Sequence, residues 1–394
     1  MSIAIDTRSV SSRKPSLLLD ELLLDQRVLR TPVVEISEHS GGRFSHLIPL
    51  TKPSPGEQYA FDVNLDACTG CKACVVACHT MNGLDENESW RDVFSITDTS
   101  SNLTQTITKA CHHCEDPACA NGCPVLAYEK DETTGIVRHL DDQCIGCSYC
   151  MMKCPYDVPK WNVKKGIVRK CDMCQSRLSA GEAPACVQSC PNEAIRIRVV
   201  KKDADVGVLF PGAFDRSYTQ PTSVYHTKRK DLPSGTDQKS EAQHHGPLAW
   251  MLVLTQLSVG GILFGKHPLA CALLGALGVA ISTLHLGQPL KAWRAFLGWR
   301  KSWLSREILA FGAYVPLAGL SVIDPRATPL ALAAGIVSVI CSIMVYVDTR
   351  RPQWRWQVTV PRFAATTLVM VLPWMLVGPL AALLVWERHR FFTR

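Results

Sequence analysis

Cysteine spacing is the feature that most constrains the fold of this chain. Sixteen of the eighteen cysteines lie between Cys68 and Cys190 and form four groups. The groups are Cys68-x2-Cys71-x2-Cys74-x3-Cys78, Cys111-x2-Cys114-x4-Cys119-x3-Cys123-Pro, Cys144-x2-Cys147-x2-Cys150-x3-Cys154-Pro and Cys171-x2-Cys174-x11-Cys186-x3-Cys190-Pro. So many cysteines exceed what an ordinary cytosolic enzyme needs, and their grouping indicates metal binding or disulfide chemistry.

The spacing within the groups favours iron–sulfur clusters over the two alternatives. Three closely spaced thiolates can surround one corner of a cluster, while the fourth cysteine points away and ligates the other cluster of a pair. Structural zinc sites use two separated cysteine pairs instead. We find no secretory signal or twin-arginine pair at the N-terminus, so we expect a cytosolic origin, where thiols stay reduced. The sequence therefore predicts two ferredoxin-like units with four clusters, and His112 and His113 are not expected to be ligands.

The composition divides the chain into a polar half and an apolar half. The mean hydropathy of +0.05 averages the two. A length of 394 residues is typical of two or three domains. We predict an N-terminal extension with a short amphipathic helix at 1–57, a four-cluster ferredoxin-like domain at 58–205, a linker at 206–246 and a membrane anchor at 247–394. The predicted fold class is α+β, with a double ferredoxin-like domain followed by an all-α transmembrane bundle.

Five apolar stretches follow the linker, at 248–264, 269–286, 308–323, 330–347 and 363–386. A helix rises 1.5 Å per residue, so stretches of this length can cross a hydrocarbon core of about 30 Å. A soluble bundle would need polar helix faces, which these runs lack. We therefore predict a multi-pass membrane protein with about five spans.

Lysine and arginine residues in the loops predict the orientation. Nine of them lie in the two loops on the side of the cysteine region, at Lys291, Arg294, Arg300, Lys301, Arg306, Arg350, Arg351, Arg355 and Arg362. The opposite loops hold only Lys266 and Arg326. The positive-inside rule then places the cysteine region in the cytoplasm, at the inner membrane of the cell. The tail residues Arg388, Arg390 and Arg394 argue the other way if the number of spans is five.

Several motifs in the cysteine region resemble those of a known family. They are Cys-Thr-Gly-Cys-Lys-Ala-Cys at 68–74, His-His-Cys-Glu-Asp-Pro-Ala-Cys at 112–119, Cys-Ile-Gly-Cys-Ser-Tyr-Cys at 144–150 and Lys-Cys-Asp-Met-Cys at 170–174. Residues 58–200 thus resemble the four-cluster electron-transfer subunits of the DMSO reductase family of molybdopterin oxidoreductases. The resemblance implies four ligand sets, namely Cys68, Cys71, Cys74 and Cys190; Cys78, Cys171, Cys174 and Cys186; Cys111, Cys114, Cys119 and Cys154; and Cys123, Cys144, Cys147 and Cys150. Because Cys147 is present, it also implies that all four clusters are [4Fe–4S].

The membrane half carries a second resemblance. Ser-Thr-Leu-His-Leu-Gly-Gln-Pro at 282–289 and Trp-Leu-Ser-Arg-Glu-Ile at 303–308 resemble the membrane-anchor subunit of DMSO reductase. The resemblance implies that His285 and Glu307 belong to a quinol site. An imidazole and a carboxylate are suitable acceptors for the two protons that quinol oxidation releases. The alternative is an interfacial histidine and a glutamate paired with Arg306 or Arg300. The family usually has about eight spans, more than the five expected here.

These features predict a fused electron-transfer and anchor subunit. It would oxidise menaquinol or another quinol and pass electrons through four [4Fe–4S] clusters to a separate catalytic subunit that holds the molybdopterin. A bis-histidine haem is not expected, because only His285 lies well within an apolar helical pattern. Two alternatives stay open. The same architecture serves quinone reduction in formate dehydrogenase or hydrogenase complexes, and a membrane-tethered polyferredoxin would have no quinone site.

Overall fold

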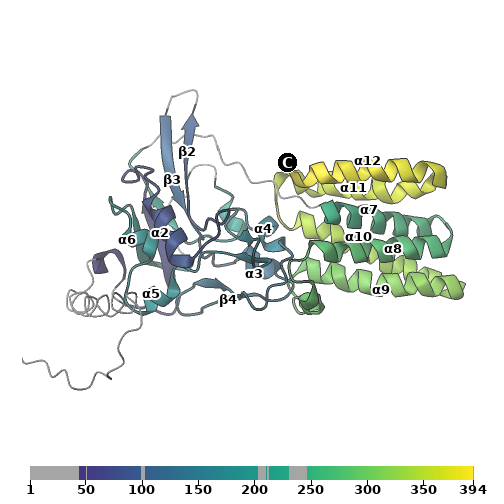
Figure 1. Cartoon of the computed structure of the whole chain (residues 1–394), viewed down its shortest axis with the longest axis horizontal. Helices are drawn as coiled ribbons and strands as arrows, with labels where there is room; N and C mark the ends of the chain where they lie inside the picture. Colours follow the sequence, from purple (N-terminus) through teal and green to yellow (C-terminus); the bar gives the residue numbers. More distant parts are fainter. Residues whose placement is uncertain are drawn as a thin grey trace, which may run out of the picture.

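The computed structural model describes residues 44–49, 51–98, 103–202, 210, 213–229 and 246–393. A cysteine-rich domain lies at one end of the molecule and a bundle of roughly parallel helices at the other (Figure 1). The helix expected within residues 1–57 lies outside the described residues. The linker expected at 206–246 is wrong for residues 213–229, which hold the 3-10 turn η2 (Arg216–Tyr218) and a strand, β9 (Val224–His226), that pairs within the sheet of the cysteine-rich domain.

A three-stranded sheet joins the two ends of the cysteine-rich domain. Its central strand β1 (Glu57–Asn64) pairs antiparallel with β8 (Ile195–Lys201) and parallel with β9 (Val224–His226). In the β1–β8 register, Val63 lies opposite Ile195. Strand β1 ends four residues before Cys68, and β8 begins five residues after Cys190. This pairing therefore brings the first and fourth cysteine groups together.

Three antiparallel hairpins and five short helices complete the domain. The hairpins are β2 (Asp92–Asp98) with β3 (Leu103–Lys109), β4 (Tyr128–Lys130) with β5 (Val137–His139), and β6 (Lys160–Asn162) with β7 (Ile167–Arg169). The helices are α2 (Ala73–Asn82), α3 (Ala118–Gly122), α4 (Tyr149–Lys153), α5 (Gln175–Ser179) and α6 (Ala185–Gln188), after a 3-10 turn η1 (Ser45–Leu47). The hairpins β4–β5 and β6–β7 connect consecutive cysteine groups, so each hairpin folds the chain back onto the next group.

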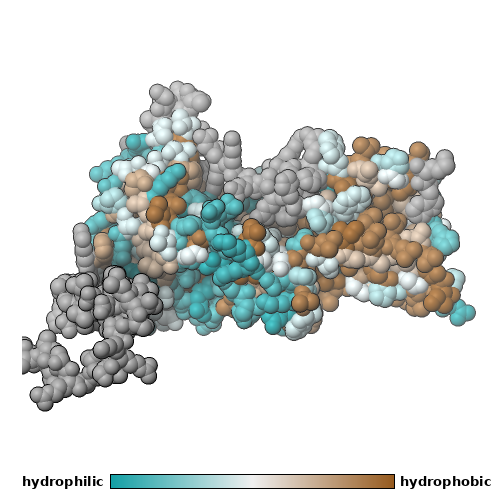
Figure 2. Space-filling view, viewed as in Figure 1, coloured by the Kyte–Doolittle hydropathy of each residue, from teal (hydrophilic) through white to brown (hydrophobic). Residues whose placement is uncertain are grey.

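The helical half contains six long helices within the described residues. They are α7 (Gly246–Leu263), α8 (Pro268–Ser282), α9 (Trp303–Ile323), α10 (Thr328–Val347), α11 (Trp356–Leu368) and α12 (Trp374–Thr393). Helix α7 contacts α8, α10, α11 and α12, and most of its side chains are buried. Apolar residues cover much of the outer surface of the bundle, whereas the cysteine-rich domain is largely hydrophilic on the same face (Figure 2). This distribution is that of a membrane-embedded bundle with a polar domain at one end.

Four helical segments among the described residues are long and apolar enough to cross a membrane. They are Gly246–Leu263, Pro268–His285, Trp303–Ile323 and Pro325–Val347. They correspond to the first four apolar stretches of the sequence.

The fifth apolar stretch differs from the expected single helix. Helix α11 ends in the 3-10 turn η7 (Val369–Val371), and Leu372 is extended with ψ 158°. The residue before a proline is pushed out of the helical region, and Pro373 follows Leu372. The chain reverses there, so α11 and α12 lie side by side and the C-terminus returns to the end of the bundle near the cysteine-rich domain (Figure 1). The end of α12 that carries Arg388 therefore lies on the same side as the nine loop cations.

Candidate metal centres and membrane site

The fold collects the sixteen cysteines into four quartets. We call them quartet I (Cys68, Cys71, Cys74, Cys190), quartet II (Cys78, Cys171, Cys174, Cys186), quartet III (Cys111, Cys114, Cys119, Cys154) and quartet IV (Cys123, Cys144, Cys147, Cys150). We group the cysteines as the family resemblance implies, and members of each quartet act electrostatically on one another. Quartets I and III each line a pocket.

The quartets follow one another in the order I, II, III and IV. Cys74 of quartet I and Cys186 of quartet II interact electrostatically. Cys171 of quartet II interacts in the same way with Cys111 of quartet III. The buried Tyr128 side chain faces Cys119 of quartet III and Cys150 of quartet IV. The sixteen thiols therefore form a continuous series rather than isolated sites.

Backbone amides point at the cysteine sulfurs. The amide two residues after the first cysteine of a group points at its Sγ. His113 N donates to Cys111, Gly146 N to Cys144 and Met173 N to Cys171, each at 3.4 Å, and the Gly70 amide acts on Cys68 in the same way. Ala127 N and Ala194 N donate at 3.2 Å to Cys123 Sγ and Cys190 Sγ. Amide donors of this kind stabilise negative charge on sulfur and tune the potential of a bound cluster.

The chemistry of the donor set fits an anionic polynuclear cluster. All eighteen cysteines are free thiols. Across the part of the chain that the structure describes, no three His, Cys, Asp or Glu side chains converge to hold a single metal ion. Burial raises the pKa of Cys78 to about 12 and that of Cys123 to about 11, so these thiolates need bound metal to form at neutral pH.

Arg91 supports the same conclusion. Its guanidinium is 2% exposed and lies between quartets I and II, where its Nε and Nη2 have no hydrogen-bond partner. A buried cation without compensation is costly, and anionic clusters in the two quartets would compensate it.

His112 and His113 are both buried within the domain, and His112 lines the same pocket as quartet III. The His112 ring lies edge-on to Tyr156 with ring centroids 4.3 Å apart, and burial lowers the pKa of His112 to about 3. His113 Nδ1 accepts a hydrogen bond from Val137 N at 3.1 Å. The expectation that neither residue is a ligand stays a prediction.

Quartets III and IV lie next to the helical bundle. Tyr149 Oη donates to Val345 O at 2.9 Å, and Lys153 Nζ forms an ion pair with Asp348 at 2.5 Å. Arg351 donates to Cys154 O at 3.1 Å and pairs with Asp157 at 2.9 Å. Buried ion pairs and side-chain-to-backbone bonds of this kind fix the separation between the α10 end of the bundle and α4.

The loop between α8 and α9 forms the other half of this contact. Gln288 N donates to Ile145 O at 3.0 Å, Gly298 N to Pro124 O at 2.8 Å and Ser302 Oγ to Gly122 O at 2.7 Å. Gly287 is required there, because a Cβ on it would lie 1.9 Å from the carbonyl oxygen of Gly166. The loop thus packs directly on the backbone that carries Cys123, Cys144 and Cys147.

The two residues of the expected quinol site lie on the same side of the bundle, close to quartet IV. His285 ends the 3-10 turn η3 (Thr283–His285), two residues before Gly287, and its Nδ1 is buried without a hydrogen-bond partner. Leu286 packs against the apolar cluster that includes Cys123 and Cys144. His285 therefore approaches quartet IV from the α8 side.

Glu307 approaches quartet IV from the α9 side. It is 4% exposed and accepts a short hydrogen bond from Ser342 on α10. The charge of Glu307 acts on Tyr149, which directly precedes Cys150 of quartet IV. Arg306 instead donates to the carbonyls of Trp299 and Arg300, so it is not the partner of Glu307. No hydrogen bond among the described residues joins His285 to Glu307.

The structure also places residues near the quartets whose positions the sequence did not predict. Lys170 is 3% exposed and its Nζ lies 3.6 Å from Cys111 Sγ. A lysine directly before a cysteine group indicates, from the sequence alone, a charge near a cluster. The sequence does not show that this lysine is buried. Nothing local marks Arg91 or Gly287, since their environments depend on tertiary contacts.

The four thiol quartets and the apolar bundle together define an iron–sulfur electron-transfer protein joined to a membrane anchor. Residues 103–200 match a family model described as a 4Fe-4S dicluster domain, and residues 266–391 match the DMSO reductase anchor subunit (DmsC). The B subunit of the anaerobic dimethyl sulfoxide reductase of Escherichia coli K12 is 35% identical over 193 residues, which are 45% of this chain and 93% of that relative. The protein therefore belongs to the family of DMSO reductase iron–sulfur subunits and carries an anchor region of the DmsC type in the same polypeptide.

Two further relatives have other names. The iron-sulfur subunit of the nitrate-inducible formate dehydrogenase of Escherichia coli K12 is 36% identical over 175 residues, 39% of this chain and 60% of the relative. The hydrogenase-2 operon protein HybA of Escherichia coli O157:H7 is 34% identical over 196 residues, 43% of this chain and 58% of the relative. The chain is thus also similar to proteins named for a formate dehydrogenase and for hydrogenase-2.

Proposed function

We propose that this chain is the electron-transfer and membrane-anchor subunit of a DMSO reductase-like anaerobic respiratory complex, in which it oxidises membrane quinol. A separate molybdopterin-containing catalytic subunit would receive the electrons. The observation that carries the proposal is the linear order of the quartets. Quartet IV lies against the bundle beside His285 and Glu307, and quartet I lies at the other end of the series, with Cys71 exposed.

Each quartet is proposed to hold one [4Fe–4S] cluster. The four clusters, when bound, supply one-electron carriers at successive positions along the cysteine-rich domain. The cysteines of each quartet hold its cluster, and the amides that donate to their sulfurs stabilise its negative charge. The exposed side of quartet I is the proposed contact for the catalytic subunit.

The bundle end is the proposed site of quinol oxidation. Quinol loses two electrons and two protons on conversion to quinone. Glu307 and His285 are the proposed proton acceptors, because the Glu307 side chain and the Nδ1 atom of the half-buried His285 are both buried at the bundle end next to quartet IV. The Ser342 hydroxyl orients the Glu307 carboxylate. The electrons leave toward quartet IV, and the protons leave through the bundle end.

Reverse electron flow is the second candidate function. The similarity to formate dehydrogenase and hydrogenase-2 proteins supports it. The match of residues 266–391 to the DMSO reductase anchor favours quinol oxidation, because it covers the half that contacts the membrane. The catalytic subunit that co-purifies with the chain distinguishes the two directions. Quinone-site inhibitors distinguish both from a tethered polyferredoxin, which would not respond to them.

Iron analysis tests the cluster assignment. Four complete quartets predict about sixteen iron and sixteen acid-labile sulfide per chain in anaerobically purified protein. EPR spectra of the same sample should contain only [4Fe–4S] signals. Stoichiometric zinc, or a stoichiometric three-iron signal in intact protein, would contradict the assignment.

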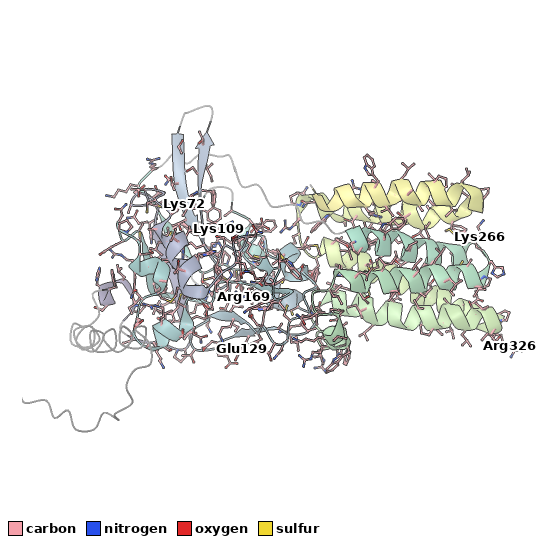
Figure 3. All side chains as sticks on the ribbon, viewed as in Figure 1. Lys72, Lys109, Glu129, Arg169, Lys266 and Arg326 are labelled. Carbon is pink, nitrogen blue, oxygen red and sulfur yellow. The ribbon has the colours of Figure 1, made fainter. Side chains whose placement is uncertain are left out.

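The cysteine-rich domain is proposed to face the cytoplasm. The loop cations Lys291 and Arg351 contact this domain, whereas Lys266 and Arg326 lie at the opposite end of the bundle (Figure 3). A reporter in the 324–329 loop should report the outside. Reporters after Gly246 and at the C-terminus should both report the cytoplasm, because α12 returns to that side. The reverse pattern would overturn the proposed orientation. If only the C-terminus lies outside, the number of membrane crossings is odd, as the sequence analysis predicts.

A further inference from the structure

One buried polar side chain occupies each junction between neighbouring quartets. Arg91 lies between quartets I and II, Lys170 between II and III, and Tyr128 between III and IV. The first two are cations, and the third is a neutral hydroxyl. The three junctions therefore differ in charge.

Arg91 is held by contacts that fix its charge in place. Its Nη1 donates to Thr108 Oγ1 at 3.1 Å, and its guanidinium lies 4.6 Å from the centroid of the Phe61 ring. Thr108 Oγ1 is 3.7 Å from Cys74 Sγ of quartet I. The charge of Arg91 also acts on three cysteines of quartet II, which are Cys78, Cys171 and Cys186.

Lys170 is held in the same way at the next junction. Its Nζ donates to Val137 O and, at 2.9 Å, to Cys171 O, and it lies 3.6 Å from Cys111 Sγ. Its charge acts on Cys111 and Cys119 of quartet III and on Cys171 of quartet II, with Asp172 a weaker contributor. The backbone carbonyls leave the ammonium no freedom to turn toward solvent.

Two other cations of the domain are paired with carboxylates, while a third, the buried Lys109, donates to the carbonyl oxygen of Tyr156. Arg169 pairs with Glu88 at 3.2 Å, and Lys153 pairs with Asp348 at 2.5 Å. No ion pair with a carboxylate among the described residues involves Arg91 or Lys170. Their charges therefore face the cysteines without a carboxylate bound directly to them.

We propose that Arg91 and Lys170 set the reduction potentials of the centres that they face, Arg91 those of quartets I and II and Lys170 those of quartets II and III. The inference rests on the proposed cluster ligands. A centre gains negative charge when it takes up an electron, so a fixed positive charge nearby stabilises the reduced form and raises the potential. Tyr128 adds no full charge at the junction of quartets III and IV, so that junction lacks this effect.

EPR-monitored redox titration of the purified full chain tests the proposal. We expect Lys170→Met to shift the one-electron reduction equilibrium of two centres toward the oxidised form by about tenfold each. A tenfold shift corresponds to a reduction potential that is lower by about 59 mV for one electron. Arg91→Met should shift two centres in the same direction, and the two variants should share one affected centre. Lys170→Arg keeps the charge and should restore potentials near the original values.

Lys164→Met is the matched control. The Lys164 side chain is 81% exposed and pairs with Asp85, so solvent screens its charge and its loss should leave all potentials unchanged. Unchanged potentials in Lys170→Met with intact signals would overturn the proposal, as would equal shifts in Lys164→Met. If Lys170→Met fails to assemble its centres, Arg91→Met decides the matter, because Arg91 makes no hydrogen bond to a cysteine sulfur. Absent cluster signals in the unmodified chain would instead refute the proposed function.

Discussion

Glu307→Gln and His285→Ala are each expected to slow quinol oxidation by about 10²–10⁴-fold while leaving the four clusters in place, because each change removes a positioned proton acceptor. Neither residue belongs to a cysteine quartet, so iron content should not change. The rate is measured as cluster reduction after mixing with quinol. An artificial donor that reduces the clusters directly should bypass the defect.

Glu387→Gln is the matched control for this experiment. It makes the same chemical change in the membrane half, but the Glu387 side chain is 40% exposed and pairs with Arg362 at 3.2 Å. We expect a rate near that of the unmodified chain. Normal quinol oxidation in Glu307→Gln and His285→Ala would show that the site lies elsewhere. Failure with both donors would indicate damaged assembly, which the iron content reports independently.

Gly287→Val is expected to separate the α8–α9 loop from the cysteine-rich domain and to abolish most quinol-driven cluster reduction. The added Cβ would lie 1.9 Å from Gly166 O and 2.5 Å from the Trp161 ring, so the two backbones must move apart. Overpacking of this kind typically costs about 1–3 kcal/mol and occasionally more. Thermal unfolding, monitored by the fluorescence of the cysteine-rich domain, measures the loss of stability. The quinol assay measures the loss of cluster reduction.

Gly312→Val provides the control for the glycine substitution. Gly312 lies on α9, and a Cβ there would meet no atom within 4 Å. Stability and quinol oxidation should both stay close to their original values. Equal behaviour of Gly287→Val and Gly312→Val would show that the close approach at Gly287 does not hold the two halves together.

The cysteine-rich domain could be predicted largely from its sequence. Cluster chemistry depends on local spacing, and the three-residue repeat at Cys68 to Cys74 or Cys144 to Cys150 is visible without any tertiary information. The first four apolar stretches could be predicted for the same reason, since hydropathy is a local property. The break in the fifth could not be predicted from hydropathy, because Leu372 is apolar and only its extended backbone before Pro373 reverses the chain.

The environments of the site residues depend on contacts distant in the sequence. The sequence places Glu307 next to Arg306, yet its hydrogen-bond partner is Ser342, which lies on another helix. The burial of Arg91 and Lys170 follows from the packing of three hairpins around the quartets. These positions therefore require the structure, whereas the identity of His285 and Glu307 came from the family resemblance.

A single polypeptide that connects membrane quinol to four clusters is the core of the proposed function. The most direct measurement is EPR of the anaerobic, purified, full-length protein in lipid after addition of a soluble menaquinol analogue, without a catalytic subunit. We expect reduced [4Fe–4S] signals that a quinone-site inhibitor suppresses and that dithionite restores. The proposed function would be contradicted if dithionite reduces the clusters but quinol leaves them oxidised at every solution potential tested.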